Sequence, residues 1–495
     1  MIERSLKKRV SFIGIGQLFN ALINILLLPY LARSLEVDVY GTYGQVLLIC
    51  GVFQAIFAFG FSKLIFNYLN QRSDETKDNL VTNTFVSCFI LAIVGVLILF
   101  LGNNYIASLM KNASLAYLLR IYALSILFNL FSGILTSVLN HFHKVKSITV
   151  VAIVNNLFRI GVIIIFIQLS FSLETIFWGL LGVSILQFLL LWVLSPTFLL
   201  KGKIQGKTIR KIILKGLPLS LSGITTILLV QTDGIMVSSL IDTESYAIYR
   251  MGAIPIPFLF IIYSSVIMVT MADVTKYFHQ GAYEKILSLK RKASFNIAIL
   301  TYPTLIFILV FAKEILGLYL GEKYHGSLWV FVIYNFLLFL RITDYRDILI
   351  AAEKTKVILI ADVSIFIFNV ILNYILILKL SAIGAVISSI ISYYLLAIIL
   401  QSQAAKTVNA RPSDFFEIGR LLKIFFISAV FAFLFYLFFR FLGAAYYFIP
   451  IMSIVYILVD YFVLIKLKIV SIQQLIDYSS HHKVLTPLNF VLRKV

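Results

Sequence analysis

Apolar runs of about 20 residues follow one another along almost the whole chain. A run of this length is what one α-helix needs to cross the hydrocarbon core of a membrane. Of the 495 residues, 61% are apolar and 13% are charged, whereas a soluble domain has about 25% charged residues. Alternation of apolar and polar residues is missing, which excludes a β-barrel and leaves helices to satisfy the backbone in lipid. We therefore expect an integral, all-α membrane protein.

The apolar runs predict about fourteen membrane-spanning helices. We place the first six at residues 11–32, 43–65, 80–102, 114–139, 148–169 and 174–194, the next six at 212–239, 247–272, 295–312, 327–342, 357–378 and 382–402, and a last pair at 421–442 and 444–466. The longest cytoplasmic connection runs from Asp273 to Ser294, with a short interfacial helix expected around residues 283–287. No segment between spans reaches the roughly 50 residues of a small soluble domain. We therefore expect no enzyme activity, no catalytic residues, no metal and no cofactor.

The positive charge of the chain indicates its orientation. The net charge is +20, which in a soluble protein would suggest nucleic acid. With fourteen spans and a cytoplasmic N-terminus, most of the 42 Lys and Arg residues fall on the cytoplasmic side and only a few on the outer side. This asymmetry follows the positive-inside rule. We expect both termini in the cytoplasm, attraction to anionic membrane lipids, and no binding of nucleic acid.

An internal repeat relates the two halves of the chain. Residues 36–43 (EVDVYGTY) follow the first predicted span, and residues 242–249 (DTESYAIY) follow the seventh, 206 positions later. Two acidic residues and two tyrosines match in register. Because six spans separate the copies, they have the same orientation in the membrane. The repeat predicts two six-helix lobes related by a pseudo-two-fold axis along the membrane normal, as in alternating-access carriers.

This repeat sets the expected domain organisation. We assign an N-terminal six-helix lobe to residues 1–195 and a C-terminal six-helix lobe to residues 196–403. Residues 404–495 then form an additional helix pair and a cytoplasmic tail.

Arg159 is the most informative polar residue within a span. It lies close to the middle of its predicted helix, and Asn155 and Asn156 share its face. An ionisable group at that depth costs about 2.5–3.5 kcal/mol on insertion scales, so it marks a functional site by default. We interpret these three residues as substrate-binding. The alternative is a structural arginine paired with a carboxylate of the other lobe.

Two acidic residues in the second half are candidates for binding a coupling ion. Asp233 lies in the seventh predicted span and Asp362 in the eleventh. A cavity between the lobes would then have a cationic wall and a wall with titratable acids. The alternative for each residue is an ordinary interhelical ion pair.

Three further residues are weaker substrate-binding candidates. Arg120 lies near the outer surface, where it could also extend its charge to the interface. Asn20 and Asn24 line one face of the first span, where hydrogen bonds between helices are the alternative. Cys50 and Cys88 lie inside apolar runs and are interpreted as core residues.

The sequence resembles the multidrug/oligosaccharidyl-lipid/polysaccharide (MOP) exporter superfamily, and within it the polysaccharide biosynthesis transporters of the Wzx type. The residues that carry the resemblance are Pro29-Tyr30-Leu31-Ala32-Arg33-Ser34-Leu35 with Tyr40-Gly41, Gly216-Leu217-Pro218 with Asp233, Tyr246-Ala247-Ile248-Tyr249, and Gly384-Ala385. The resemblance implies a MATE-like fold with an extra C-terminal helix pair. The predicted number of fourteen spans is similar to that of lipid II flippases. The several cavity arginines of that branch are not evident in this sequence.

The resemblance also implies a function. Such carriers move an undecaprenyl-diphosphate-linked oligosaccharide, an O-antigen or capsule repeat unit, across the bacterial cytoplasmic membrane, with H⁺ or Na⁺ as the coupling ion. Arg159 matches the expected type of diphosphate-facing cation. Polysaccharide polymerase and chain-length proteins would be partners. The alternative is a MATE-like, ion-coupled exporter of drugs or small metabolites.

Overall fold

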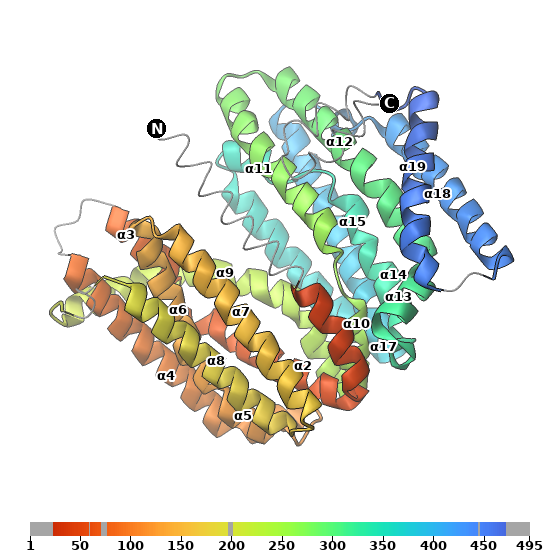
Figure 1. Ribbon diagram of the computed structural model, residues 1–495. Coiled ribbons are helices and arrows are strands. Elements are labelled where there is room, and N and C mark those ends of the chain that lie inside the picture. The colour runs from red at the N-terminus through yellow and green to blue at the C-terminus, as the bar shows by residue number, and fades with distance from the viewer. Residues whose placement is uncertain (1–22, 59, 71–76, 197–200, 444–445, 472–495) are drawn as a thin grey trace. The chain divides into compact units, whose positions relative to one another are not determined.

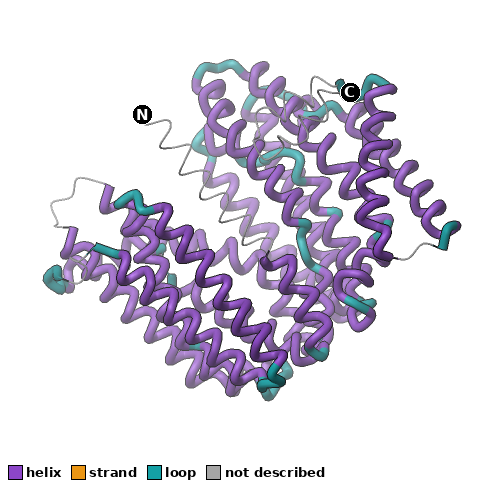
Figure 2. The backbone as a smooth tube through the Cα atoms, in the orientation of Figure 1, coloured by secondary structure: helices purple, strands orange, loops and turns teal. Residues whose placement is uncertain are grey.

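The structure is a computed structural model that describes residues 23–58, 60–70, 77–196, 201–443 and 446–471. The described residues form helices joined by short connections, and no strand occurs among them (Figure 1, Figure 2). Nine helices of this part are long and apolar enough to cross a membrane. The predicted all-α membrane fold is confirmed.

The chain divides into two compact units, Met1–Ala247 and Ile248–Val495. The division falls inside α10 (Thr243–Gly252), whereas the sequence predicts lobes that end at residues 195 and 403. The compact units reflect how tightly the helices pack, whereas the predicted lobes were defined by the sequence repeat. The predicted lobes therefore stay a prediction. The two units are described separately below.

Unit 1 is a bundle of helices that follow the predicted spans. It contains helical residues 23–34, α2 (Val37–Phe57), α3 (Phe61–Asn70), α4 (Lys77–Leu109), α5 (Leu115–Tyr122), α6 (Leu124–His141), α7 (Val145–Gln168), α8 (Leu173–Leu194) and α9 (Gly206–Leu240). α8 packs against α6 and α7, α3 against α6, and α2 against α9. The uncovered faces are rich in Leu, Ile and Phe, as lipid contact requires.

The sequence repeat has a structural counterpart. α2 begins at Val37 and α10 begins at Thr243, so the two helix starts have the offset of the repeat. The first tyrosine of each copy, Tyr40 and Tyr246, is almost completely buried. A Cβ atom added at Gly41 would collide with the carbonyl oxygen of Thr243. The small residue of the first copy is therefore needed because α2 approaches the second copy closely.

Hydrogen bonds reinforce this contact inside unit 1. The buried Gln45 side chain donates to Ser238 Oγ at 2.6 Å and to the carbonyl oxygen of Met110 at 3.3 Å. Asn112 donates to Gln45 Oε1 at 2.6 Å. The start of α2 is thus tied to the end of α9 and to the connection before α5.

Unit 2 is also a bundle of helices, and it includes the C-terminal pair. It contains α11 (Pro257–His279), α12 (Tyr283–Val310), α13 (Ala312–Leu320), α14 (Ser327–Asn335), α15 (Leu337–Leu340), α16 (Asp347–Ala351), α17 (Thr355–Thr407), α18 (Ile418–Phe441) and α19 (Ile449–Lys466). α18 and α19, blue in Figure 1, pack against each other and against α12.

α17 consists of two spans in one helical segment. Ser381 has φ 51° and ψ −135°, which interrupts the helix and falls between the predicted spans 357–378 and 382–402. A Cβ atom at Gly384 would collide with the carbonyl oxygen of Leu376, so the chain needs glycine where it passes close to itself. Asn369 and Asn373 are buried, and Asn369 donates to Ser392 Oγ at 3.2 Å. The polar residues of the first part thus bind the second part.

Several helix boundaries differ from the prediction, because the predicted spans 114–139, 247–272 and 327–342 are each divided between two helices, α5 and α6, α10 and α11, and α14 and α15. The predicted span 43–65 is divided into α2 and α3, with Gly60 at φ +60° between them. A left-handed residue ends a helix, and glycine adopts that conformation at little cost. The predicted interfacial helix at 283–287 is the start of α12, which continues from Tyr283 into the predicted span. The polar first turns of α12 therefore belong to the same helix as the apolar run that follows them.

α19 covers a proline break in α12. Pro303 has no N–H, so the carbonyl oxygen of Ile299 lacks its helical donor. The Tyr461 hydroxyl of α19 donates to that oxygen at 3.1 Å, and Tyr456 donates to the Pro303 carbonyl oxygen at 3.2 Å. The C-terminal helix pair is therefore a bonded part of unit 2.

Candidate functional site

Arg159 lies in the middle of α7 and is half-buried. No described residue accepts a hydrogen bond from it or forms an ion pair with it. A guanidinium carries five N–H donors and keeps its charge in any protein environment. The described part of unit 1 thus holds a cation at membrane depth without a carboxylate partner.

The two asparagines near Arg159 make different contacts. Asn155 donates to Gln187 Oε1 of α8 at 3.0 Å, and its own Oδ1 is buried without a partner among the described residues. Asn156 donates to the Ala152 carbonyl oxygen of its own helix at 2.9 Å. The predicted polar face therefore exists, and part of it joins α7 to α8.

The weaker candidates are not brought to Arg159 by any described contact. Arg120 is exposed near the end of α5, and Asn24 is exposed in the first helical turn of the described chain. Asn20 lies outside the described residues. Exposure of Arg120 agrees with a side chain that reaches toward the interface.

The two candidate coupling residues have different environments. Asp233 is 4% exposed in α9. Asp362, at the start of α17, accepts a hydrogen bond from Arg346 at 2.7 Å, and the two side chains are 21% and 43% exposed. Asp362 is thus paired with the connection before α16, not with another helix, and its coupling role stays a prediction.

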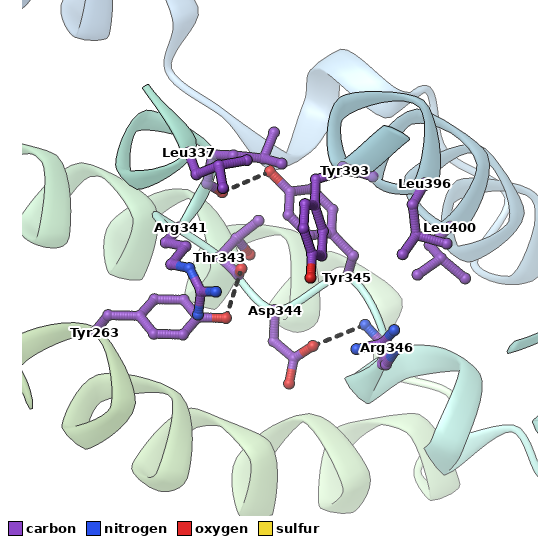
Figure 3. A pocket seen from close by; sticks show the side chains of 12 residues that line it. Tyr263, Leu337, Arg341, Thr343, Asp344, Tyr345, Arg346, Tyr393, Leu396 and Leu400 are labelled. Carbon is purple, nitrogen blue, oxygen red and sulfur yellow. Dashed lines mark hydrogen bonds between the residues drawn. The ribbon is translucent and has the colours of Figure 1, made fainter. Parts of the chain in front are cut away.

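Unit 2 contains a cavity that the sequence analysis missed. Its volume is about 150 Å³, and Figure 3 shows its lining. The lining residues are Tyr263 from α11, Leu337 and Leu340 from α15, Arg341, Thr343, Asp344, Tyr345 and Arg346 from the following connection, and Tyr393, Leu396, Ala397 and Leu400 from α17. The polar side chains come mainly from the connection between α15 and α16.

A buried ion pair fixes this connection. Lys290 of α12 and Asp347, the first residue of α16, are 2.7 Å apart, and their side chains are 3% and 2% exposed. Burial raises the pKa of the Asp347 carboxyl, and the charge of Lys290 opposes this shift. Lys290 also donates to the Asp344 carbonyl oxygen at 2.5 Å. One side chain thus binds both ends of the polar segment.

The side chains of Tyr345 and Asp344 also hold the connection between α15 and α16 in place. Burial raises the pKa of Tyr345, so its hydroxyl stays protonated, and it donates to the Leu340 carbonyl oxygen at 2.9 Å. Asp344 Oδ1 accepts from the backbone N–H of Arg346 at 2.8 Å. A sequence signal was present, because residues 341–347 (RITDYRD) form a dense polar run directly after an apolar span.

Comparisons with known proteins agree with this architecture. A profile of the family described as "Polysaccharide biosynthesis protein" matches residues 6–272, more than half of the chain. No curated protein sequence matches the chain.

Three solved structures share the fold. The lipid II flippase MurJ in an inward closed conformation is 18% identical with a TM-score of 0.73, covering 93% of this chain and 100% of that chain. An inward-facing MATE family multidrug resistance transporter of the MOP superfamily is 15% identical with a TM-score of 0.60, covering 81% and 99%.

The third is a MOP superfamily transporter from Pyrococcus furiosus, described as having a binding pocket of reverse polarity. It is 15% identical with a TM-score of 0.52, covering 81% of this chain and 96% of that chain. At such identities the likeness shows the fold alone. The family profile covers more than half of the sequence, and the chain therefore belongs to the polysaccharide biosynthesis protein family, with the fold of MOP superfamily transporters.

Proposed function

We propose that the protein is a flippase for an undecaprenyl-diphosphate-linked oligosaccharide, an O-antigen or capsule repeat unit. It would move this lipid from the cytoplasmic to the outer leaflet of the bacterial cytoplasmic membrane by alternating access. Membership of a polysaccharide biosynthesis family supports a glycan substrate. The fold, shared with a lipid II flippase, supports a lipid-linked one.

The observation that carries the proposal is Arg159. A diphosphate cannot enter hydrocarbon without compensation of its charge, and a guanidinium offers paired N–H donors that match phosphate oxygens. Arg159 is half-buried at mid-helix, and no described carboxylate occupies its donors. Asn155, whose buried Oδ1 has no partner among the described residues, and Asn156 would extend this polar face toward the substrate.

The other predicted residues keep roles within the proposal. Asp233, which is buried in α9, and Asp362, which is paired with Arg346, remain the candidates for H⁺ or Na⁺ coupling. Arg120, Asn20 and Asn24 would contact the substrate along its path. Both termini would be cytoplasmic, and polymerase and chain-length proteins would act on the product at the outer leaflet.

An exporter of organic cations is the competing function. The shared fold of multidrug transporters is compatible with it. A guanidinium at membrane depth repels a cationic drug, so Arg159, for which the described chain offers no carboxylate, argues against this alternative.

Thermal stabilisation of the purified, detergent-solubilised protein tests the proposal. The probes are a short-chain polyprenyl diphosphate, the matching monophosphate and an organic cation dye. A ligand at 100 times its Kd stabilises the folded state by about 2.7 kcal/mol, which is readily measured. We expect stabilisation by the diphosphate that is lost in Arg159→Ala and partly kept in Arg159→Lys.

The matched control is Lys63→Ala. Lys63 is an exposed cation of α3, in the same unit as Arg159, so its removal should leave the response to diphosphate unchanged. Diphosphate stabilisation that is identical in Arg159→Ala would remove this residue from the proposed site. A response to the dye alone would favour the exporter.

A further inference from the structure

The cavity in unit 2 gathers hydrogen-bonding groups from three segments. Arg341, Asp344 and Tyr393 all line this cavity, and the Asp344 carboxylate is turned toward Arg346 (Figure 3). Arg341 also lies over the ring of Tyr263, with 5.9 Å between the guanidinium carbon and the ring centroid. Donors and acceptors therefore meet in one cavity, where α11, the α15–α16 connection and α17 come together.

The polar wall is held in place before any ligand arrives. Lys290 binds the Asp344 carbonyl oxygen and the Asp347 carboxylate, and Asp344 Oδ1 binds the backbone N–H of Arg346. A binding site gains affinity when its groups are already ordered, because less entropy is lost on binding. A buried ion pair that fixes an irregular connection is therefore typical of a site with a required geometry.

The charges of the wall select the chemical class of the ligand. No described residue donates a hydrogen bond to Asp344 Oδ2, so a charged acceptor remains beside the donors of Arg341. A phosphate offers acceptors only, and Asp344 repels it. An organic cation is repelled by Arg341. A hydroxyl group both donates and accepts, so a ligand with several neighbouring hydroxyls satisfies both side chains.

The size and the apolar lining fit one ring. A volume of about 150 Å³ equals that of an engineered cavity that binds benzene, so this cavity holds at most one six-membered ring, and part of the exocyclic groups of a hexose would lie at its mouth. The tyrosine rings and Leu396 offer apolar surface to the C–H groups of a sugar, while its hydroxyls reach the polar wall.

We propose that this cavity binds a single sugar ring through hydroxyl contacts to Asp344 and Arg341. The inference rests on the proposed flippase function, because it names the part of the lipid-linked oligosaccharide that unit 2 recognises. By the predicted topology the α15–α16 connection is cytoplasmic, on the side from which the substrate is taken. The cavity thus selects the glycan before it is moved.

Saturation-transfer difference NMR on the full-length protein tests this site. The detergent must lack a sugar headgroup, and the probes are glucose, galactose and N-acetylglucosamine, with inorganic phosphate and tetraphenylphosphonium as representatives of other classes. We expect at least one sugar to bind with a Kd on the order of 1–10 mM, as a small ligand allows. Asp344→Asn keeps the side-chain shape and should weaken binding about tenfold or more, as should Arg341→Ala.

Two control variants separate this proposal from the flippase proposal. Lys354 lies just before α17, donates to Thr407 and does not line the cavity, so Lys354→Ala is the first control. Arg159→Ala lies in unit 1. Neither should change sugar binding, so loss of diphosphate binding and loss of sugar binding are observed independently.

Several results would overturn the sugar site. One is the absence of saturable binding by every sugar up to about 100 mM, and another is equal binding by wild type, Asp344→Asn and Arg341→Ala. Phosphate binding that Arg341→Ala removes would assign the cavity to an anion. Tetraphenylphosphonium binding that Asp344→Asn removes would assign it to a cation. If Asp344→Asn does not fold, Arg341→Ala and Tyr393→Phe decide.

Discussion

Lys290 shows how one residue can serve a site from outside it. The sequence places it in a basic run of a cytoplasmic connection, where a charge would contact water and lipid headgroups. The structure buries it against Asp347 at 2.7 Å. A buried ion pair gains little net stability over apolar residues, but leaving one partner alone is costly. The pair therefore fixes the geometry of the α15–α16 connection more than it raises overall stability.

This account predicts the effect of removing one charge. Lys290→Met keeps the length of the side chain and leaves the Asp347 carboxylate buried without its partner. The free energy of unfolding should fall by about 3–5 kcal/mol. Thermal unfolding of the purified variant, compared with wild type in the same detergent, measures the loss.

The double variant Lys290→Met with Asp347→Leu is the control. It removes both charges, so most of the loss should be recovered. A single variant that unfolds like wild type, or a double variant that is no better than the single one, would mean that the pair is not buried in the membrane-embedded protein.

Single residues differ in how far the sequence predicts them. Arg159 stands out because a charge in the middle of an apolar run has few explanations. The partner of Asp362 could not be predicted, because Arg346 lies in a connection whose path depends on tertiary packing. Lys290 was hidden by its basic neighbours Arg291 and Lys292, which share the composition of a topology signal.

At the scale of elements, the contact between α12 and α19 is unusually specific. Pro303 removes one helical hydrogen bond, and an unsatisfied carbonyl in the membrane is costly. Tyr461 supplies the missing donor to Ile299, and Ser428 of α18 donates to the buried Asp460 of α19 at 3.0 Å. The C-terminal pair is therefore matched to this part of α12.

The contact predicts a thermodynamic coupling between two positions. Tyr461→Phe should lower the free energy of unfolding by about 1 kcal/mol, the net value of one hydrogen bond. In a Pro303→Ala background, the new N–H of residue 303 can bond the Ile299 carbonyl, so Tyr461→Phe should cost much less. Unfolding of the four proteins of this double-mutant cycle gives the coupling. Equal costs of Tyr461→Phe in both backgrounds would refute the role of Tyr461 at the break.

Whole helices were easier to predict than single contacts, because a helix that crosses the membrane must have an apolar stretch of a certain length. The break near residue 381 was found from the gap between two apolar runs. The division into α2 and α3 was missed because residues around Gly60 are as apolar as a continuous span. The repeat was visible in the sequence because Tyr40 and Tyr246 are buried at equivalent helix starts, and burial at the same place requires the same residue type.

At the scale of the whole molecule, fold and substrate are different conclusions. The same architecture occurs in a lipid II flippase and in multidrug transporters, so the substrate must be argued from side chains. The cavity of unit 2 could not be predicted from the sequence, since its lining comes from α11, α15, the following connection and α17. Only packing brings these distant segments together.

Transport by the reconstituted protein tests the central claim most directly. Proteoliposomes would carry a fluorescent, undecaprenyl-diphosphate-linked saccharide, and a membrane-impermeant quencher added outside would report the fraction that reaches the outer leaflet. We predict transfer that depends on wild-type protein and on an H⁺ or Na⁺ gradient, with a rate reduced about tenfold or more in Arg159→Ala, the loss of one charge-assisted contact. Transfer no faster than in protein-free vesicles, together with gradient-driven uptake of an organic cation, would contradict the flippase account.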